Sequence, residues 1–150
     1  ILPREAVAAV AMLRRHGILV ERLTQPTELQ VDAYTVAGVT HEQAYNHAAT
    51  TIVEVGEVVT QDRTFPVGTY IVPTAQYLGR LVTHMLEVET EDNVVYWNTM
   101  DAWIPRTPQA GGRGGGRGGF GRGRGQAGPP VVPIFKLMAP TALPTRVMGS

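Results

Sequence analysis

Residues 109–130 limit what this chain can fold into more than any other part of the sequence. They are dominated by glycine, arginine and proline and contain one aromatic residue, Phe120. Such a segment cannot bury enough apolar surface to form a core of its own. Apolar residues return at 134–138, where they could add a strand back onto the fold. We therefore predict one α+β domain built from residues 1–108 and 131–148, with residues 109–130 as an insertion loop between the two parts.

Two segments have the spacing of amphipathic helices. Residues 3–16 carry an apolar stripe, Pro3 suits the first turn, and Gly17 suits the position just after the last turn. Residues 75–87 place four apolar side chains on one face, namely Leu78, Leu81, Val82 and Met85.

Alternation of apolar and polar residues, together with short apolar runs, predicts strands around these helices. The predicted strands are residues 18–23, 28–35, 51–55 and 69–72. Gly56 interrupts the alternation and predicts a bulge or a tight turn. Proline and glycine give residues 65–68 the pattern of a type I turn, while residues 92–103 fit either a short helix or a packed loop. Together the segments predict a mostly antiparallel sheet of four to six strands, two packed helices and a long Gly/Arg-rich loop.

Three blocks of the sequence share a pattern with a known family. They are ILP at 1–3 with LRRHGI at 13–18, FPVGTYIVPTAQYLGRL at 65–81 with LE at 86–87 and WNTMD at 97–101, and PIFKL at 133–137. In order and spacing they resemble the region that follows the catalytic domain in large secreted bacterial zinc carboxypeptidases of the M14 type. The pattern departs at Val88, where the family has proline, and the Gly/Arg-rich segment has no counterpart in it. The residues that carry the motif are Gly68, Tyr70, Pro73, Gln76, Leu86, Glu87, Asp92, Trp97, Asn98 and Asp101.

The resemblance implies a non-catalytic C-terminal accessory domain of a secreted M14-like enzyme, located outside the cell or in the periplasm. Its expected partner is the catalytic domain of the parent chain, which it would pack against, stabilise or orient. As a separate chain it would expose the surface facing that domain, and exposed apolar patches favour self-association. We therefore also expect a homo-oligomer or an extracellular filament. The chain begins at Ile1 without a basic and apolar signal region, so we interpret it as a piece of a longer protein.

Composition sets further limits on function. Thirteen basic and thirteen acidic residues cancel, so no overall field attracts nucleic acid or an anionic membrane. The sequence has no cysteine, which excludes disulfides and thiolate metal sites. No apolar run approaches the roughly 20 residues of a membrane-spanning helix, so we expect no membrane partner.

The sequence offers no complete set of catalytic residues. A zinc site of the M14 type needs two His and one Glu as ligands and a second Glu as base. His41 and His47 are six residues apart, on nearly opposite sides of a helix, and His84 with Glu87 lacks a third ligand. Serine occurs once, at Ser150, so a serine or cysteine nucleophile is excluded. We therefore expect no catalytic residue, metal or cofactor, and a stand-alone metallopeptidase ranks last among the hypotheses.

The acidic residues around the motif have a structural interpretation instead. Glu87 and Asp101 are predicted to be buried acids that accept hydrogen bonds within the fold. Glu89, Glu91 and Asp92 are most simply the charged end of the second helix.

The Gly/Arg-rich segment resembles an RGG box, which binds RNA through arginine–phosphate contacts and stacking on bases. Nucleic-acid binding is the alternative function. We do not favour it, because the rest of the chain is not basic and has no RNA-recognition motif of aromatic residues on a sheet. Extended Gly/Pro-rich chain can instead add to the sheet edge of a neighbour, which would favour a packed oligomer. The candidate interaction residues are Arg113, Arg117, Phe120, Arg122 and Arg124.

Overall fold

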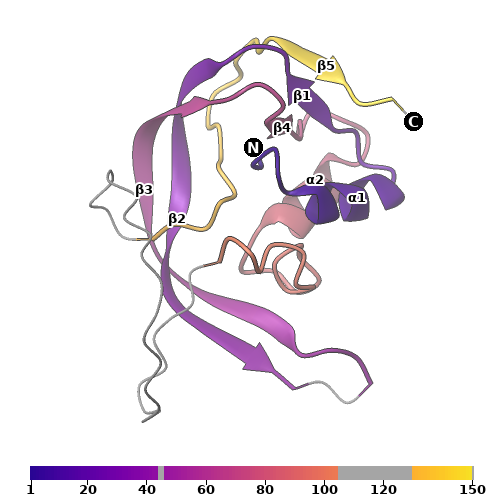
Figure 1. Cartoon of the computed structure of the whole chain (residues 1–150), viewed down its shortest axis with the longest axis vertical. Helices are drawn as coiled ribbons and strands as arrows, with labels where there is room; N and C mark the ends of the chain where they lie inside the picture. The colour runs from indigo at the N-terminus through magenta and orange to yellow at the C-terminus, as the bar shows by residue number, and fades with distance from the viewer. Residues whose placement is uncertain (44–45, 105–129, 150) are drawn as a thin grey trace, which may run out of the picture.

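Two α-helices and five β-strands make up the part of the chain that the computed structural model describes, residues 1–43, 46–104 and 130–149 (Figure 1). Strands that pair within this part do so antiparallel. The predicted α+β fold class is therefore confirmed. In chain order the elements are α1 (Val7–Arg15), β1 (Glu21–Leu23), β2 (Thr27–Glu42), β3 (Thr50–Phe65), β4 (Tyr70–Ile71), α2 (Gly79–Leu86) and β5 (Thr145–Val147).

The strands form two sheets rather than the single sheet of four to six strands expected from the sequence. β1 lies between β4 and β5 in a three-stranded sheet, and β2 pairs with β3 in a two-stranded one. Pro26 separates β1 from β2, and a proline has no backbone N–H to continue a ladder. The segment after residue 130 does return to β2, but as two isolated bridges, which join Asp32 to Lys136 and Thr35 to Val131.

The β2–β3 hairpin consists of two 16-residue strands, longer than any strand predicted from the sequence. Its pairing register changes twice near the middle, between Tyr34 and Val36 and again between Val36 and Gly38. The predicted interruption at Gly56 is confirmed as a bulge in this region. A Cβ on Gly56 would lie 2.5 Å from Thr35 Oγ1, so a larger residue there would displace the hydroxyl that bonds to the Glu57 carbonyl.

Both helices begin later than the sequence predicts. Ahead of α1, the Ala6 N–H bonds to the Pro3 carbonyl at 2.9 Å, which makes a separate turn before the helix starts. Ahead of α2, the Gly79 N–H bonds to the Gln76 carbonyl at 2.9 Å. A Cβ on Gly79 would lie 2.1 Å from the Thr74 carbonyl oxygen. The residues predicted to form the first turn of each helix therefore form a separate tight turn ahead of it.

Three connections test further predictions from the sequence: the end of α1, the turn after β3 and residues 92–103. Gly17, with a φ of 81°, follows the C-cap of α1 and confirms the predicted helix end. The turn after β3 runs from Pro66 to Thr69, whose N–H bonds to the Pro66 carbonyl at 3.2 Å, and Gly68 in third place has a φ of 86°. Gly68 has a positive φ and Val67 does not, which is the pattern of a type II turn, so the type I assignment for residues 65–68 was wrong. Residues 92–103 form successive turns, not a helix.

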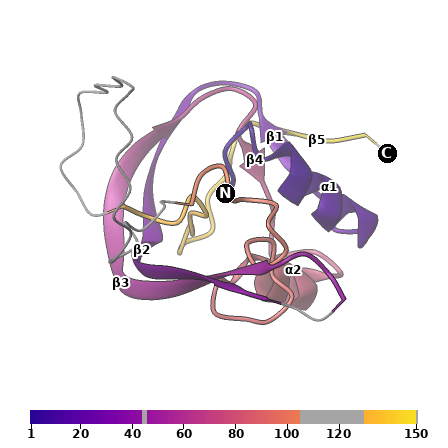
Figure 2. The same cartoon turned by 60° about the horizontal axis from the view of Figure 1, so that its bottom comes forward.

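Two apolar clusters hold these elements together. The larger joins both helices to the turns before residue 104, and Leu13, Val82 and Met100 are almost fully buried in it. The smaller packs against β2 and includes Phe65 and Phe135, whose ring centroids lie 5.4 Å apart in an edge-to-face contact. Figures 1 and 2 show the hairpin curving along one side of the molecule and then past α2.

Candidate functional site

Gln76, from the central block of the motif, ties the segment after α1 to the turn before α2. Its Oε1 accepts a hydrogen bond from the Leu19 N–H at 2.8 Å. Its Nε2 donates to the carbonyls of Leu19 at 3.1 Å and Pro73 at 2.7 Å. An amide suits this place because it accepts and donates on one side chain. Gln76 therefore acts as a clamp inside the domain.

The WNTMD block holds the hairpin against the rest of the domain through Thr51 of β3. The Thr51 hydroxyl lies 2.9 Å from Asn98 Oδ1, 3.0 Å from Asp101 Oδ1 and 3.2 Å from His41 Nδ1. Asn98 also donates to the Ala49 carbonyl at 2.7 Å. Because one hydroxyl carries one proton, it can donate to only one of the two acceptor oxygens at a time. This cluster anchors β3 at several points.

The order of these side chains differs from that of a catalytic relay. In such a relay the imidazole stands between the acid and the hydroxyl, whereas Asp101 contacts the Thr51 hydroxyl directly. Thr51 is also only 2% exposed, so a substrate carbonyl has no access to it. The prediction that Asp101 is buried was wrong: the residue is exposed and is held at the surface by its hydrogen bond to Thr51.

The turns after α2 use two residues in left-handed backbone conformations. Asp92 and Asn98 have φ values of 61° and 62°, which Asp and Asn adopt more readily than most side chains. Asp92 Oδ1 accepts a hydrogen bond from Trp97 Nε1 at 3.2 Å. Glu89, Glu91 and Asp92 follow the end of α2 and lie in these turns. They are therefore not a charged helix end, because the helix stops before them.

The remaining motif residues support the backbone and the core. Tyr70 is 1% exposed and exchanges backbone hydrogen bonds with Leu2 at 2.9 and 3.0 Å. Gly68 supplies the positive φ of the turn after β3. Pro73 and Leu86 line an apolar pocket.

Glu87 forms an ion pair with Lys136, the only lysine of the chain, at 2.6 Å. Lys136 Nζ also donates to the Tyr34 hydroxyl at 3.1 Å and lies 4.2 Å from the centroid of that ring. Burial lowers the pKa of Lys136, but hydrogen bonds to Glu87 and Tyr34 raise the pKa more, so it lies above its ordinary value. The predicted structural role of Glu87 fits this contact, although its side chain is 22% exposed and so only partly buried. Glu87 Oε1 has no hydrogen-bond partner among the described residues.

Lys136 is a partner of the motif that the sequence pattern did not predict. The available signal was a single lysine inside the apolar run at 134–138. Lys136 and Glu87 are 49 positions apart, so sequence spacing alone could not pair them.

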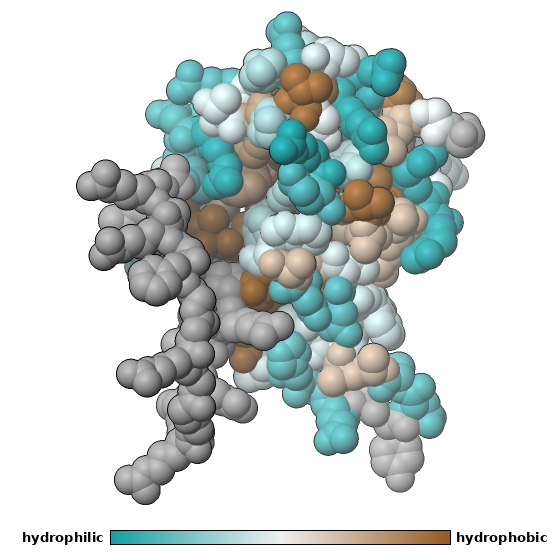
Figure 3. Space-filling view, viewed as in Figure 1, coloured by the Kyte–Doolittle hydropathy of each residue, from teal (hydrophilic) through white to brown (hydrophobic). Residues whose placement is uncertain are grey.

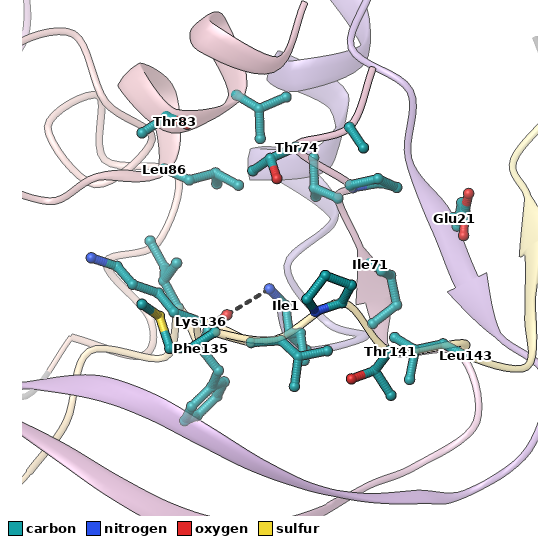
Figure 4. A pocket seen from close by; sticks show the side chains of 18 of the residues that line it. Ile1, Glu21, Ile71, Thr74, Thr83, Leu86, Phe135, Lys136, Thr141 and Leu143 are labelled. Atoms are coloured by element: carbon teal, nitrogen blue, oxygen red, sulfur yellow. Dashed lines mark hydrogen bonds between the residues drawn. The ribbon is translucent and has the colours of Figure 1, made fainter.

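An apolar pocket of about 750 Å³ lies between β4 and α2 on one side and residues 134–145 on the other (Figure 4). Glu87 and Lys136 are two of its few charged lining residues. Pockets of this size and lining accommodate apolar groups of a ligand or partner. Sequence reasoning missed this pocket because its walls come from distant parts of the chain. Its apolar lining residues include Ile71, Val72, Val82, Leu86, Phe135 and Leu143.

The histidines considered as zinc ligands lie in other settings. His41 contacts the Thr51 hydroxyl, and the His47 ring lies 5.3 Å from that of Trp97. Glu87, the residue paired with His84 in sequence, binds Lys136. Within the described ranges no group of three or more His, Cys, Asp or Glu side chains converges on a point.

The candidate RNA-contacting residues of the Gly/Arg-rich segment fall outside the described part of the chain. These residues are Arg113, Arg117, Phe120, Arg122 and Arg124.

None of the helices within the described part is long and apolar enough to cross a membrane.

No protein-family model, curated protein or solved structure matches this chain. The resemblance of its three sequence blocks to the C-terminal region of M14 carboxypeptidases therefore stays a prediction. What the geometry adds is the role of each motif residue inside the domain.

Proposed function

We propose that this chain is a non-catalytic accessory domain of a secreted zinc carboxypeptidase of the M14 type, working outside the cell or in the periplasm. One observation carries the proposal: the polar motif residues bind other segments of the same domain. Gln76 clamps two connections, Asn98 and Asp101 hold the hairpin, and Glu87 binds Lys136. A motif that maintains a shape suits a domain whose task is to position a neighbour.

The apolar pocket beside α2 is the surface on which the catalytic domain would dock. Apolar side chains inserted there would contribute about 25 cal/mol per Å² of surface removed from water. Glu87 and Lys136 in its wall would fix the orientation of a partner more than they would add affinity. Met138 lines the same pocket and is 72% exposed, so it is free to contact a partner.

The parent enzyme provides the test. The catalytic domain encoded before this region should bind the separate domain in solution, measured by calorimetry. Met138→Glu should weaken that binding by roughly tenfold, because it puts a charge in an apolar contact. Val7→Glu is the matched control, since Val7 is 60% exposed on α1 and does not line the pocket.

Three results would overturn the proposal. One is a parent gene that encodes no zinc carboxypeptidase domain. Another is equal binding by the Met138→Glu and Val7→Glu variants. The third is chelator-sensitive release of C-terminal amino acids by this chain alone.

The separate domain is also expected to self-associate, because a surface built for a partner stays uncovered. Figure 3 shows apolar patches among polar residues on one face of the molecule. Light scattering over a range of concentrations would measure this association.

A further inference from the structure

β3 carries a row of outward-pointing backbone groups at residues 58–64. On β2, Asp32 exchanges backbone hydrogen bonds with Lys136 at 2.8 and 2.9 Å, so its N–H and C=O point away from β3. In an antiparallel ladder, the residue opposite such a position also turns its N–H and C=O away from its partner. Thr60 is the residue opposite Asp32. The two-residue period then gives the same outward direction to Val58, Asp62 and Thr64.

This edge has no partner among the described residues. β3 pairs with β2 alone, and no described backbone group bonds to the outward groups of residues 58–64. At the far end of β3 the situation differs, because the Thr51 N–H bonds to the Tyr96 carbonyl at 3.1 Å. Figure 1 shows β3 on the outer side of the hairpin, with the segment after residue 130 on the side of β2. Such an edge is a template for another strand.

We infer that this edge of β3 pairs antiparallel with the same edge of a second copy, about a two-fold axis at Thr60. Val58 and Asp62 would pair across the axis, and Thr60 would face itself, giving about six hydrogen bonds in all. No residue of β3 lines the apolar pocket to which the self-association above was attributed, so this inference names a second surface and goes beyond that proposal. It does not depend on the carboxypeptidase assignment.

Charge favours the axis at Thr60. That register places Arg63 opposite Glu57 of the second copy, and symmetry makes the contact twice. Glu57 is exposed, and the Arg63 guanidinium is held 4.6 Å from the centroid of the Phe135 ring. Arg63 is therefore half-buried and fixed over Phe135 in the monomer, and the pairing requires Glu57 of the second copy to reach it there.

Neighbouring registers lack this match. An axis at Val58 would put Asp62 opposite Glu54, and an axis at residue 62 would put Asp62 opposite itself. Axes at residues 59 and 61 leave Arg63 opposite a valine. Since like charges opposite each other destabilise a strand pair, the sequence of β3 selects one register.

Charge reversal tests the register directly. Glu57→Arg and Arg63→Glu each place like charges opposite each other, and each should raise the dimer dissociation constant by roughly tenfold. Mixing the two variants should restore the wild-type constant, because the positive edge of one meets the negative edge of the other. Sedimentation velocity over a concentration series measures all three samples.

Thr60→Lys gives an independent variant on the axis itself, where two lysines would meet. Tyr77→Lys is its matched control, since it adds the same charge to a fully exposed residue outside the hairpin. Circular dichroism of each variant shows whether it folds, and Thr60→Lys carries the test if Arg63→Glu does not fold. We expect Thr60→Lys to abolish dimers and Tyr77→Lys to leave them.

Two outcomes overturn the pairing: a monomer at every concentration, or association that Thr60→Lys and Glu57→Arg leave unchanged. A monomer that still binds the catalytic domain would overturn the pairing and leave the accessory role intact. A dimer that Thr60→Lys disrupts, but that does not bind the catalytic domain, would support the pairing and overturn the accessory role.

Discussion

The Glu87–Lys136 pair allows a quantitative test of what the motif contributes to stability. Lys136→Met keeps most of the side-chain length but removes hydrogen bonds of 2.6 Å to Glu87 and 3.1 Å to Tyr34. A hydrogen bond to a charged group contributes about 1.5–3 kcal/mol. The two side chains are 34% and 22% exposed, so water replaces part of that contribution. We therefore expect the free energy of unfolding to fall by about 2 kcal/mol.

A double-mutant cycle separates the pair from its surroundings. Glu87→Met removes the acid, and combining it with Lys136→Met removes both charges together. Since losing both partners leaves no unpaired charge, the double variant should lose about 1 kcal/mol less than the sum of the single losses. Urea denaturation with linear extrapolation measures each free energy, and equal m-values would show that the unfolded states are comparable.

The pH dependence of this effect has a definite sign. Because the folded pKa of Lys136 lies above its ordinary value of 10.5, the pair contributes its full stabilisation below that value. The stabilisation is lost as pH rises through the folded pKa. The difference between wild type and Lys136→Met should therefore be constant near neutral pH and shrink above about 10.5.

Arg4 and Glu5 provide a matched control with the same 2.6 Å separation. Their side chains are 57% and 54% exposed, so the corresponding cycle should show no measurable coupling. A coupling below about 0.3 kcal/mol for Glu87–Lys136 would refute the reasoning, since that is the usual error of additivity.

Three further predictions concern the clamp, the anchor and the chain start. Thr51→Val keeps the side-chain volume but loses the hydroxyl bonded to Asn98. It should therefore lower the free energy of unfolding by about 1–2 kcal/mol and speed amide hydrogen exchange in the hairpin. Unchanged exchange would argue against the anchor. Gln76→Ala removes three hydrogen bonds and should lower the melting temperature, whereas Tyr77→Ala, at a fully exposed residue, should not. In a separate domain produced with Ile1 as its first residue, burial lowers the pKa of the Ile1 amino group from 8.0 to about 5. The unfolded chain then binds more protons between these values, so stability should rise from pH 5 to pH 8, and acetylation of the amine should remove this rise.

Local features of the fold were predictable because they depend on neighbours in sequence. Gly17 and Gly56 were identified correctly, since Gly17 has the positive φ that favours glycine after a helix and Gly56 interrupts the alternation of β3 where the register shifts. Helix starts were less predictable. The apolar stripe continues into residues 75–78, but a turn closed by Gln76 competes with the helix there.

Long-range features could not be predicted from periodicity. The division into two sheets depends on which strands meet, and β1 pairs with segments far along the chain. The Lys136 contact and the apolar pocket depend on the same meeting of distant segments. Asp101 was predicted to accept a hydrogen bond within the fold, and it accepts one from Thr51. Its exposure could not be predicted, because it depends on where the turns place the residue.

The position of β1 also sets the order in which this domain can be completed. The hydrogen bond from Thr145 to Glu21 spans 124 positions, whereas the β2–β3 hairpin joins strands that are adjacent in the chain. Contacts between distant residues form late, because the loop they close costs entropy before they repay it. At synthesis rates of about 5–20 residues per second, the hairpin can form long before β5 exists. The three-stranded sheet must wait for the last strand, so one side of β1 stays open to wrong partners during most of the chain's synthesis.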